Sequence, residues 1–130
     1  MRIIIDLPPL SEEATTRACI ELMDSVARVG LICEEELGEA PSLYDSGVKF
    51  AQEPFTDGEH FDLPWLCIRR GWMDCDDAAI WRNMELWRAG EHAAGSRVIW
   101  PEGTRRYHAQ NRRGDNTVED ATQIIERATP

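Results

Sequence analysis

Three residues of this 130-residue chain have side chains suited to nucleophilic catalysis by a thiol: Cys75, His108 and Asp120. A thiolate attacks carbonyl carbon, an imidazole takes up and returns the proton, and a carboxylate beside the imidazole fixes its tautomer and stabilises its charged form. Cys75 follows Asp74 at the expected start of a helix, where unpaired N–H groups and the helix dipole favour a thiolate. Nearby carboxylates oppose this effect, so a reactive Cys75 needs a base.

The helix that carries Cys75 is the clearest element in the sequence. Asp74 is a suitable N-cap, and Asp77 stands three residues further on in the arrangement of a capping box. Apolar residues then follow at helical spacing along one side until Gly90 supplies a stop. These residues are Ile80, Met84 and Trp87.

The other two residues are expected on a small antiparallel sheet. The pattern predicts strands over residues 96–100, 107–112 and 117–120, with turns at 101–104 and 113–116. If the second turn is centred on Gly114, paired residue numbers sum to 228, and His108 faces Asp120 with Cβ atoms about 5 Å apart. A shift of one residue would turn the two side chains onto opposite faces.

The N-terminal half contributes a helix and a long connection. Residues 2–7 are rich in β-forming residues, and Ser11 is an N-cap for an amphipathic helix that is expected to end near Gly30. From residue 34 to residue 64 the sequence is rich in Pro, Gly, Asp and Glu, which predicts a long ordered loop.

The charge of the chain is concentrated in its first half. There are 24 acidic and 14 basic residues in all, and residues 1–66 carry 14 acidic and four basic groups. Such an acidic protein is not expected to bind nucleic acid. The segment 97–113, with five arginines and one glutamate, is interpreted first as a solvated hairpin edge and second as an anion-binding surface. No apolar run approaches the roughly 20 residues of a membrane helix, and the start lacks a secretory signal, so a cytoplasmic protein is expected.

The cysteines and histidines do not form a recognisable metal or disulfide pattern. The four cysteines are Cys19, Cys33, Cys67 and Cys75. Cys19 and Cys33 lie among apolar residues and are expected to be buried and inert, whereas His60 and His92 lie in polar segments and are expected at the surface. A metal held by the cysteine, histidine and aspartate described above is a third, less favoured interpretation, because neither a CxxC nor an HExxH arrangement accompanies them.

Three motifs together resemble a known family. The segments 71–77 (GWMDCDD), 106–109 (RYHA) and 118–120 (VED) resemble the Cys-His-Asp triad of the transglutaminase-like branch of the papain-like thiol enzymes. The chain from LYDSGV at residues 43–48 through EPF at 53–55 to the C-terminus is similar to short transglutaminase-like proteins of bacteria and tailed phages. The resemblance covers roughly residues 40–125.

The resemblance implies a role for each matched residue. Cys75 would be the nucleophile, His108 the general base and acid, and Asp120 the carboxylate that orients the imidazole. The oxyanion hole would use the backbone N–H of Cys75 and one side-chain donor. The candidates for this donor are Trp72, Tyr44 and Gln52.

The predicted fold is a single α+β domain over residues 1–130, of the papain-like, transglutaminase-like kind. Residues 1–66 form an acidic N-terminal helix and long loop, and residues 67–130 a helix bearing the cysteine packed on a small antiparallel sheet bearing the histidine and aspartate. The expected function is acyl transfer from a peptide or protein amide, by hydrolysis or transamidation, without metal or organic cofactor.

The alternative is a non-catalytic structural or adaptor protein of a phage virion, built on the same fold. Its partners would be other virion proteins, and the acidic first half would suit a basic partner surface. The expected location is then the virion as well as the cytoplasm of the producing cell. A thiol with a depressed pKa favours the enzyme, and a buried unreactive Cys75 favours the structural protein.

Overall fold

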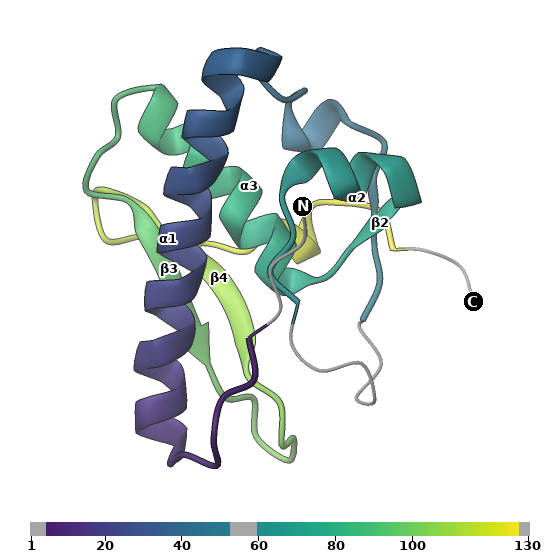
Figure 1. The fold of residues 1–130 in the computed structure, drawn as a ribbon. Coiled ribbons are helices and arrows are strands. Elements are labelled where there is room, and N and C mark those ends of the chain that lie inside the picture. The colour runs from purple at the N-terminus through teal and green to yellow at the C-terminus, as the bar shows by residue number, and fades with distance from the viewer. Residues whose placement is uncertain (1–4, 53–59, 128–130) are drawn as a thin grey trace.

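The computed structural model describes residues 5–52 and 60–127 and has the expected mixed α+β architecture (Figure 1). A long helix and a shorter one lie against the same face of a three-stranded antiparallel sheet. These elements are α1 (Glu12–Leu37), α3 (Cys75–Arg88), and β3 (Gly95–Ile99), β4 (His108–Arg112) and β5 (Val118–Glu119) in that spatial order. Outside them lie α2 (Pro64–Arg70), the 3-10 turns η1 (Leu43–Asp45) and η3 (Ala121–Gln123), and a parallel pair of strands, β1 (Lys49–Phe50) and β2 (Trp72–Met73).

The prediction for α3 is confirmed in detail. The helix begins at Cys75, and the Asp74 carboxylate accepts the N–H of Asp77 at 3.0 Å while the Asp77 carboxylate accepts the N–H of Asp74 at 3.2 Å. Ile80 and Met84 are fully buried on the side that faces α1 and the sheet. Local signals alone therefore determine where this helix begins.

The predicted end of α1 is wrong, because the helix continues past Gly30 to Leu37. Gly30 is buried inside the helix, and a Cβ on it would lie 2.5 Å from Sδ of Met84. The glycine therefore permits a close approach of α1 to α3 and does not end the helix. The end is provided by Gly38, whose φ of 84° takes the chain out of the helical region and whose N–H donates to the carbonyl of Glu34.

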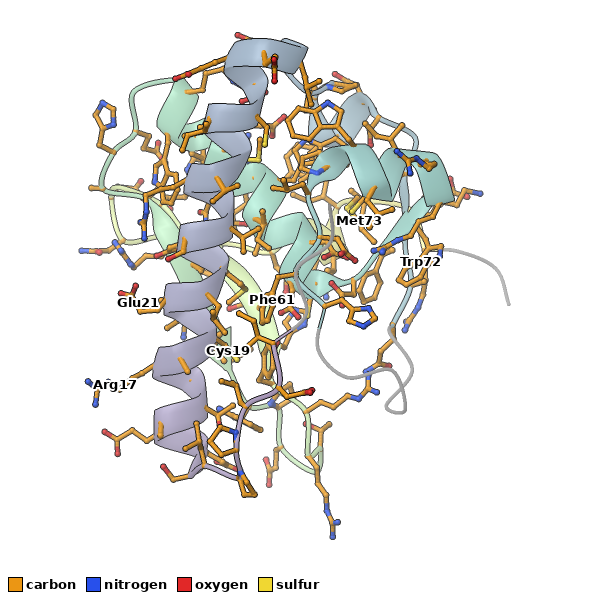
Figure 2. The ribbon with its side chains drawn as sticks, viewed as in Figure 1. Arg17, Cys19, Glu21, Phe61, Trp72 and Met73 are labelled. Atoms are coloured by element: carbon orange, nitrogen blue, oxygen red, sulfur yellow. The ribbon has the colours of Figure 1, made fainter. Side chains whose placement is uncertain are left out.

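Replacing Gly30 with alanine is expected to destabilise the protein, although alanine is the better helix former. The new methyl group would displace Met84, and overpacking of this kind costs about 1–3 kcal/mol. Urea unfolding at pH 7 measures the change. The control is Arg17→Ala, at an exposed position of the same helix that points away from the protein (Figure 2), where a change within about 0.5 kcal/mol is expected. A Gly30→Ala variant as stable as the parent would contradict the close approach.

The β4–β5 hairpin has a different register from the predicted one. Asn111 lies opposite Glu119, so paired residue numbers sum to 230 and not to 228. The connecting loop has three residues, and Asn116, its last, adopts the left-handed region with φ 69°. Because the shift is two residues, every side chain stays on its expected face, and His108 and Asp120 become diagonal neighbours on one side of the sheet.

The predicted long loop over residues 34–64 is only partly correct. Its first residues belong to α1, η1 and β1 interrupt it, and Leu43 and Val48 are buried in a second apolar cluster. Helix α2, which begins at Pro64, was not expected, because seven residues are too few to show helical periodicity. Residues 2–4 of the predicted first strand and residues 53–59 of the loop lie outside the described residues, and residues 5–7 are irregular.

The apolar core forms two clusters, one on each side of α3. The first joins α3 to α1 and the sheet and includes Met23, Ile80 and Ala109. The second lies beneath η1, α2, β2 and η3 and includes the fully buried Trp81. Within residues 5–52 and 60–127, none of the helices combines the length and the hydropathy that crossing a bilayer requires.

Candidate active site

The N-terminus of α3 is joined to the residue before His108 by one buried hydrogen bond. Asp76, the second residue of α3, is 2% exposed and accepts a hydrogen bond from the Tyr107 hydroxyl at 2.8 Å. Cys75 directly precedes Asp76, and His108 directly follows Tyr107. The contact therefore holds the first turn of the helix against the start of β4, a link that the sequence pattern did not indicate.

The Cys75 thiol lies at the edge of β4. Its sulfur accepts the backbone N–H of Ala109 at 3.5 Å. In the described part of the chain, β5 pairs with β4 at Asn111 and Arg112, so the sulfur lies beyond the end of β5 along this edge. Cys75 is half-buried and packs against the first apolar cluster. The thiol is thus fixed directly beside the residue that follows His108.

His108 and Asp120 are in direct contact. The His108 Nε2 lies 2.7 Å from Asp120 Oδ2, and both side chains are partly buried, at 22% and 14% exposed. Because Nε2 is directed at the carboxylate, Nδ1 is the ring nitrogen on which a thiol proton would be received. The predicted contact between these residues is therefore present, and it is made by diagonal neighbours and not by directly opposed ones.

Asp120 is held by donors on both of its oxygens. The Gln110 side-chain amide donates to Oδ2 at 3.1 Å, and Thr122 donates to Oδ1 through its N–H at 3.1 Å and its hydroxyl at 2.6 Å. Burial raises the pKa of Asp120, but these bonds and His108 outweigh burial and hold the pKa below its ordinary value. The carboxylate is therefore ionised where it meets the imidazole. Gln110 and Thr122 were not among the predicted site residues.

Two of the predicted oxyanion-hole candidates lie near the strand ends that lead to Cys75. Strands β1 and β2 run parallel, and the N–H of Ala51 donates to the carbonyl of Met73 at 2.9 Å. Gln52 is the next residue after Ala51 and is exposed, and Trp72 lies in β2 and is half-buried. This pairing places Gln52 at the same end of the small sheet as Cys75.

The third candidate, Tyr44, has its hydroxyl engaged elsewhere. The hydroxyl donates to Glu119, which also accepts from Arg82, and the Arg82 guanidinium lies over the Tyr44 ring. Burial and the contact with Glu119 raise the pKa of Tyr44, so the hydroxyl keeps its proton. Glu119 and Asp120 are consecutive residues and project to opposite faces of the strand. Tyr44 thus supports the strand that precedes Asp120 and is not brought to the thiol by any described contact.

A buried charge cluster lies beneath the N-terminus of α3. Arg70 donates to Asp62 and to Asp77, at 2.6 Å each, and both acidic side chains are 1% exposed. Its Nε donates to the carbonyl of Trp72 at 2.9 Å, and the guanidinium lies 3.9 Å from the centre of the Trp72 ring. The cluster fastens α2 and β2 to the first turn of α3. Only Asp77 could be placed from sequence, because Arg70 lies on the unpredicted helix α2.

Two expectations about exposure are wrong. His60 was expected at the surface but is 8% exposed, because the chain is buried throughout this segment, with Phe61 3% and Asp62 2% exposed. Cys33 was expected to be buried but is only partly covered, because the turns of α1 beyond Gly30 extend past the core. Cys19 is buried as expected, and His92 is exposed as expected.

Comparison of the chain with protein-family models, curated proteins and solved structures finds no match. Among the described residues, no group of three or more His, Cys, Asp and Glu side chains is arranged to hold a metal ion. What the site can do therefore follows from its own geometry.

Proposed function

We propose that this protein is a thiol acyl-transfer enzyme with a papain-like, transglutaminase-like fold, in which Cys75, His108 and Asp120 form a catalytic triad. One observation carries the proposal: His108, whose Nε2 lies 2.7 Å from Asp120 Oδ2, directly precedes Ala109, whose N–H donates to the Cys75 sulfur. A thiol at a helix N-terminus beside an imidazole oriented by a carboxylate is the arrangement that nucleophilic catalysis needs.

In the proposed reaction the Cys75 sulfur attacks the carbonyl carbon of a peptide or protein amide. His108 Nδ1 takes the thiol proton and gives it to the amide nitrogen, so that the C–N bond breaks, the amine leaves and a thioester remains. Water or a second amine then attacks the thioester, loses a proton to His108, and restores the thiol. The negative oxygen of each tetrahedral intermediate would be met by the Cys75 N–H and the Gln52 side-chain amide.

The acidic residues around the thiol are largely engaged with donors, which supports the proposal. Asp76 accepts from Tyr107, and Asp77 is paired with Arg70. A carboxylate whose charge is met by a donor or a cation repels a neighbouring thiolate less. The opposition expected from Asp77 is therefore reduced, and the helix N–H groups favour the thiolate, whereas Asp76 Oδ1, which lies 4.0 Å from the Cys75 sulfur, still opposes it.

Alkylation by iodoacetamide tests the proposal. An ordinary thiol with a pKa of about 8.5 is only about 0.3% thiolate at pH 6, so we expect Cys75 to react about 100-fold faster than a free thiol at that pH. The rate should fall to the ordinary profile in His108→Ala and stay unchanged in His92→Ala, where an exposed histidine is lost. Mass spectrometry of the modified peptides separates Cys75 from Cys67, whose thiol pKa is raised by burial.

An ordinary alkylation profile at Cys75, unaffected by His108→Ala, would contradict the proposal. It would favour the non-catalytic alternative, in which the same fold is a structural or adaptor protein of a virion. If the thiol is activated, incorporation of a fluorescent primary amine into a glutamine-containing protein distinguishes transamidation from hydrolysis, because only transamidation retains the amine in the product.

A further inference from the structure

A cavity of about 350 Å³ lies against Tyr107, the residue before His108. It is bounded by the segment that precedes α1, by the first half of α1 and by the loop that joins β3 to β4. Its inner wall is apolar and largely aromatic. The wall includes Cys19, Phe61, Trp100 and Tyr107, of which Cys19 and Phe61 lie close together near the centre of the molecule (Figure 2). The volume is at the lower end of the range of small-molecule pockets, about 300–1,000 Å³.

The cavity and the thiol share a wall. Tyr107 lines the cavity, and its hydroxyl bonds to Asp76, the residue after Cys75. Cys19 and Phe61 belong to the same apolar cluster against which Cys75 and Tyr107 pack. A peptide whose amide reaches Cys75 therefore has this cavity within the reach of a neighbouring side chain.

The charge at the cavity is net positive. Arg105 and Arg106 line it from the β3–β4 loop, and Asp6 is the acidic residue among the lining side chains. Arg105 is exposed, and Arg106 is partly covered. Both residues belong to the arginine-rich segment 97–113, whose sequence indicates a hairpin edge or an anion-binding surface. An arginine beside an apolar pocket favours a ligand that combines an apolar group with a carboxylate.

We propose that the cavity binds an aromatic side chain of the acyl substrate, next to an acidic residue that Arg105 pairs with. This assignment rests on the proposed function, because it names the peptide whose amide is presented to Cys75. The aromatic wall provides stacking and edge contacts for the ring, with Trp100 and Tyr107 themselves in edge-to-face contact at 6.0 Å. The substrate class is thus an acidic peptide segment that contains an aromatic residue.

Binding is measured in the Cys75→Ala variant, which cannot react, by the NMR shifts of the Trp100 indole as peptides are titrated. The probes are acetyl-Glu-Phe-amide, acetyl-Lys-Phe-amide and acetyl-Glu-Gly-amide. We expect the first to bind and each of the others to bind at least about tenfold more weakly, since one loses the ion pair and the other the buried ring. Equal affinity for all three peptides, or no shift of the Trp100 indole, would overturn the proposal.

Two variants and one control locate the binding. Cys19→Phe fills the cavity and should abolish binding, whereas Cys33→Phe, on the same helix but away from the cavity, should not. Arg105→Glu changes an exposed residue and should reverse the preference between the glutamate and lysine peptides even if Cys19→Phe does not fold. An unchanged preference in Arg105→Glu would overturn the proposed pairing.

A last measurement separates this inference from the proposed function. In the native chain, saturating acetyl-Glu-Phe-amide should slow iodoacetamide alkylation of Cys75 at least about threefold, because a bound substrate covers the thiol. An activated Cys75 whose alkylation the peptide leaves unchanged would overturn the subsite and retain the proposed function. Peptide binding at the cavity with an ordinary, unactivated Cys75 would overturn the proposed function and show a binding site without acyl transfer.

Discussion

Replacing Arg70 with methionine is expected to lower the free energy of unfolding by about 3–5 kcal/mol, because two buried carboxylates lose their shared cation. Methionine keeps most of the apolar stem of arginine and leaves little empty space. The decrease in unfolding free energy therefore measures the loss of the charge and its hydrogen bonds. Chemical unfolding at pH 7 measures it. Arg69→Met is the matched control, since Arg69 is the exposed neighbour on the same helix and should change stability by no more than about 0.5 kcal/mol.

The loss of unfolding free energy in Arg70→Met should depend on pH. Burial raises the pKa of Asp77 to about 6, and Arg70 is among the groups that lower it. A carboxyl with a raised pKa contributes stability below its ordinary value of 3.8 and loses it as the pH rises through about 6. Without Arg70, ionised Asp77 is still less favourable in the folded protein. The difference in unfolding free energy between parent and variant should therefore grow from pH 4 to pH 7. A constant difference would contradict the charge-based explanation.

The parts of the fold that could be predicted are those specified by local interactions. The start of α3 follows from a capping box within four residues and from apolar spacing, and both operate wherever the helix is placed. The contact of His108 with Asp120 was predicted for a related reason, since alternation along a strand fixes the face of each side chain. The register was wrong because Asn116 adopts the left-handed conformation in a three-residue loop, which the sequence permits but does not require.

The parts that could not be predicted depend on contacts between distant segments. Gly30 was interpreted as a helix end, but its role is set by Met84, which lies 54 positions away. Arg70 and Tyr107 were not expected in the site, because their partners become apparent only when α2 and β4 pack on α3. Tyr44 was a candidate for the oxyanion hole, but its hydroxyl donates a hydrogen bond to Glu119, 75 residues further on. The periodicity of apolar residues in a sequence does not indicate contacts between such distant residues.

Replacing Asp120 with asparagine is expected to impair the proposed chemistry while leaving the fold intact. Asparagine retains an oxygen that can accept from Thr122, but its amide can donate to His108 Nε2 and favour the wrong tautomer. Hydrogen bonds to charged groups contribute about 1.5–3 kcal/mol, so alkylation of Cys75 at pH 6 should slow about 10- to 100-fold. Turnover of an amide substrate should fall about 10²- to 10⁴-fold, the range for general acid–base catalysis.

The controls for Asp120→Asn separate the imidazole contact from the other bonds of the same carboxylate. Thr122→Val removes the hydroxyl bond to Oδ1, and Gln110→Leu removes the amide bond to Oδ2, and neither changes the charge that faces His108. Both should retain most of the alkylation rate. Rates in Thr122→Val as low as those in Asp120→Asn would mean that Asp120 acts as a structural cap of η3 and not as a triad carboxylate.

The pH dependence of stability provides a second readout for Asp120. Hydrogen bonds overcome burial and hold its pKa below the ordinary 3.8, so its stabilising contribution is complete above that value and is lost as the pH falls through the lower folded pKa. The parent should therefore be more stable than Asp120→Asn at pH 7, and the difference should shrink as the pH falls below 3.8. A difference that stays constant down to pH 2 would mean that the fold does not stabilise the ionised carboxylate, so that the bonds from His108, Gln110 and Thr122 do no more than offset the cost of burying it.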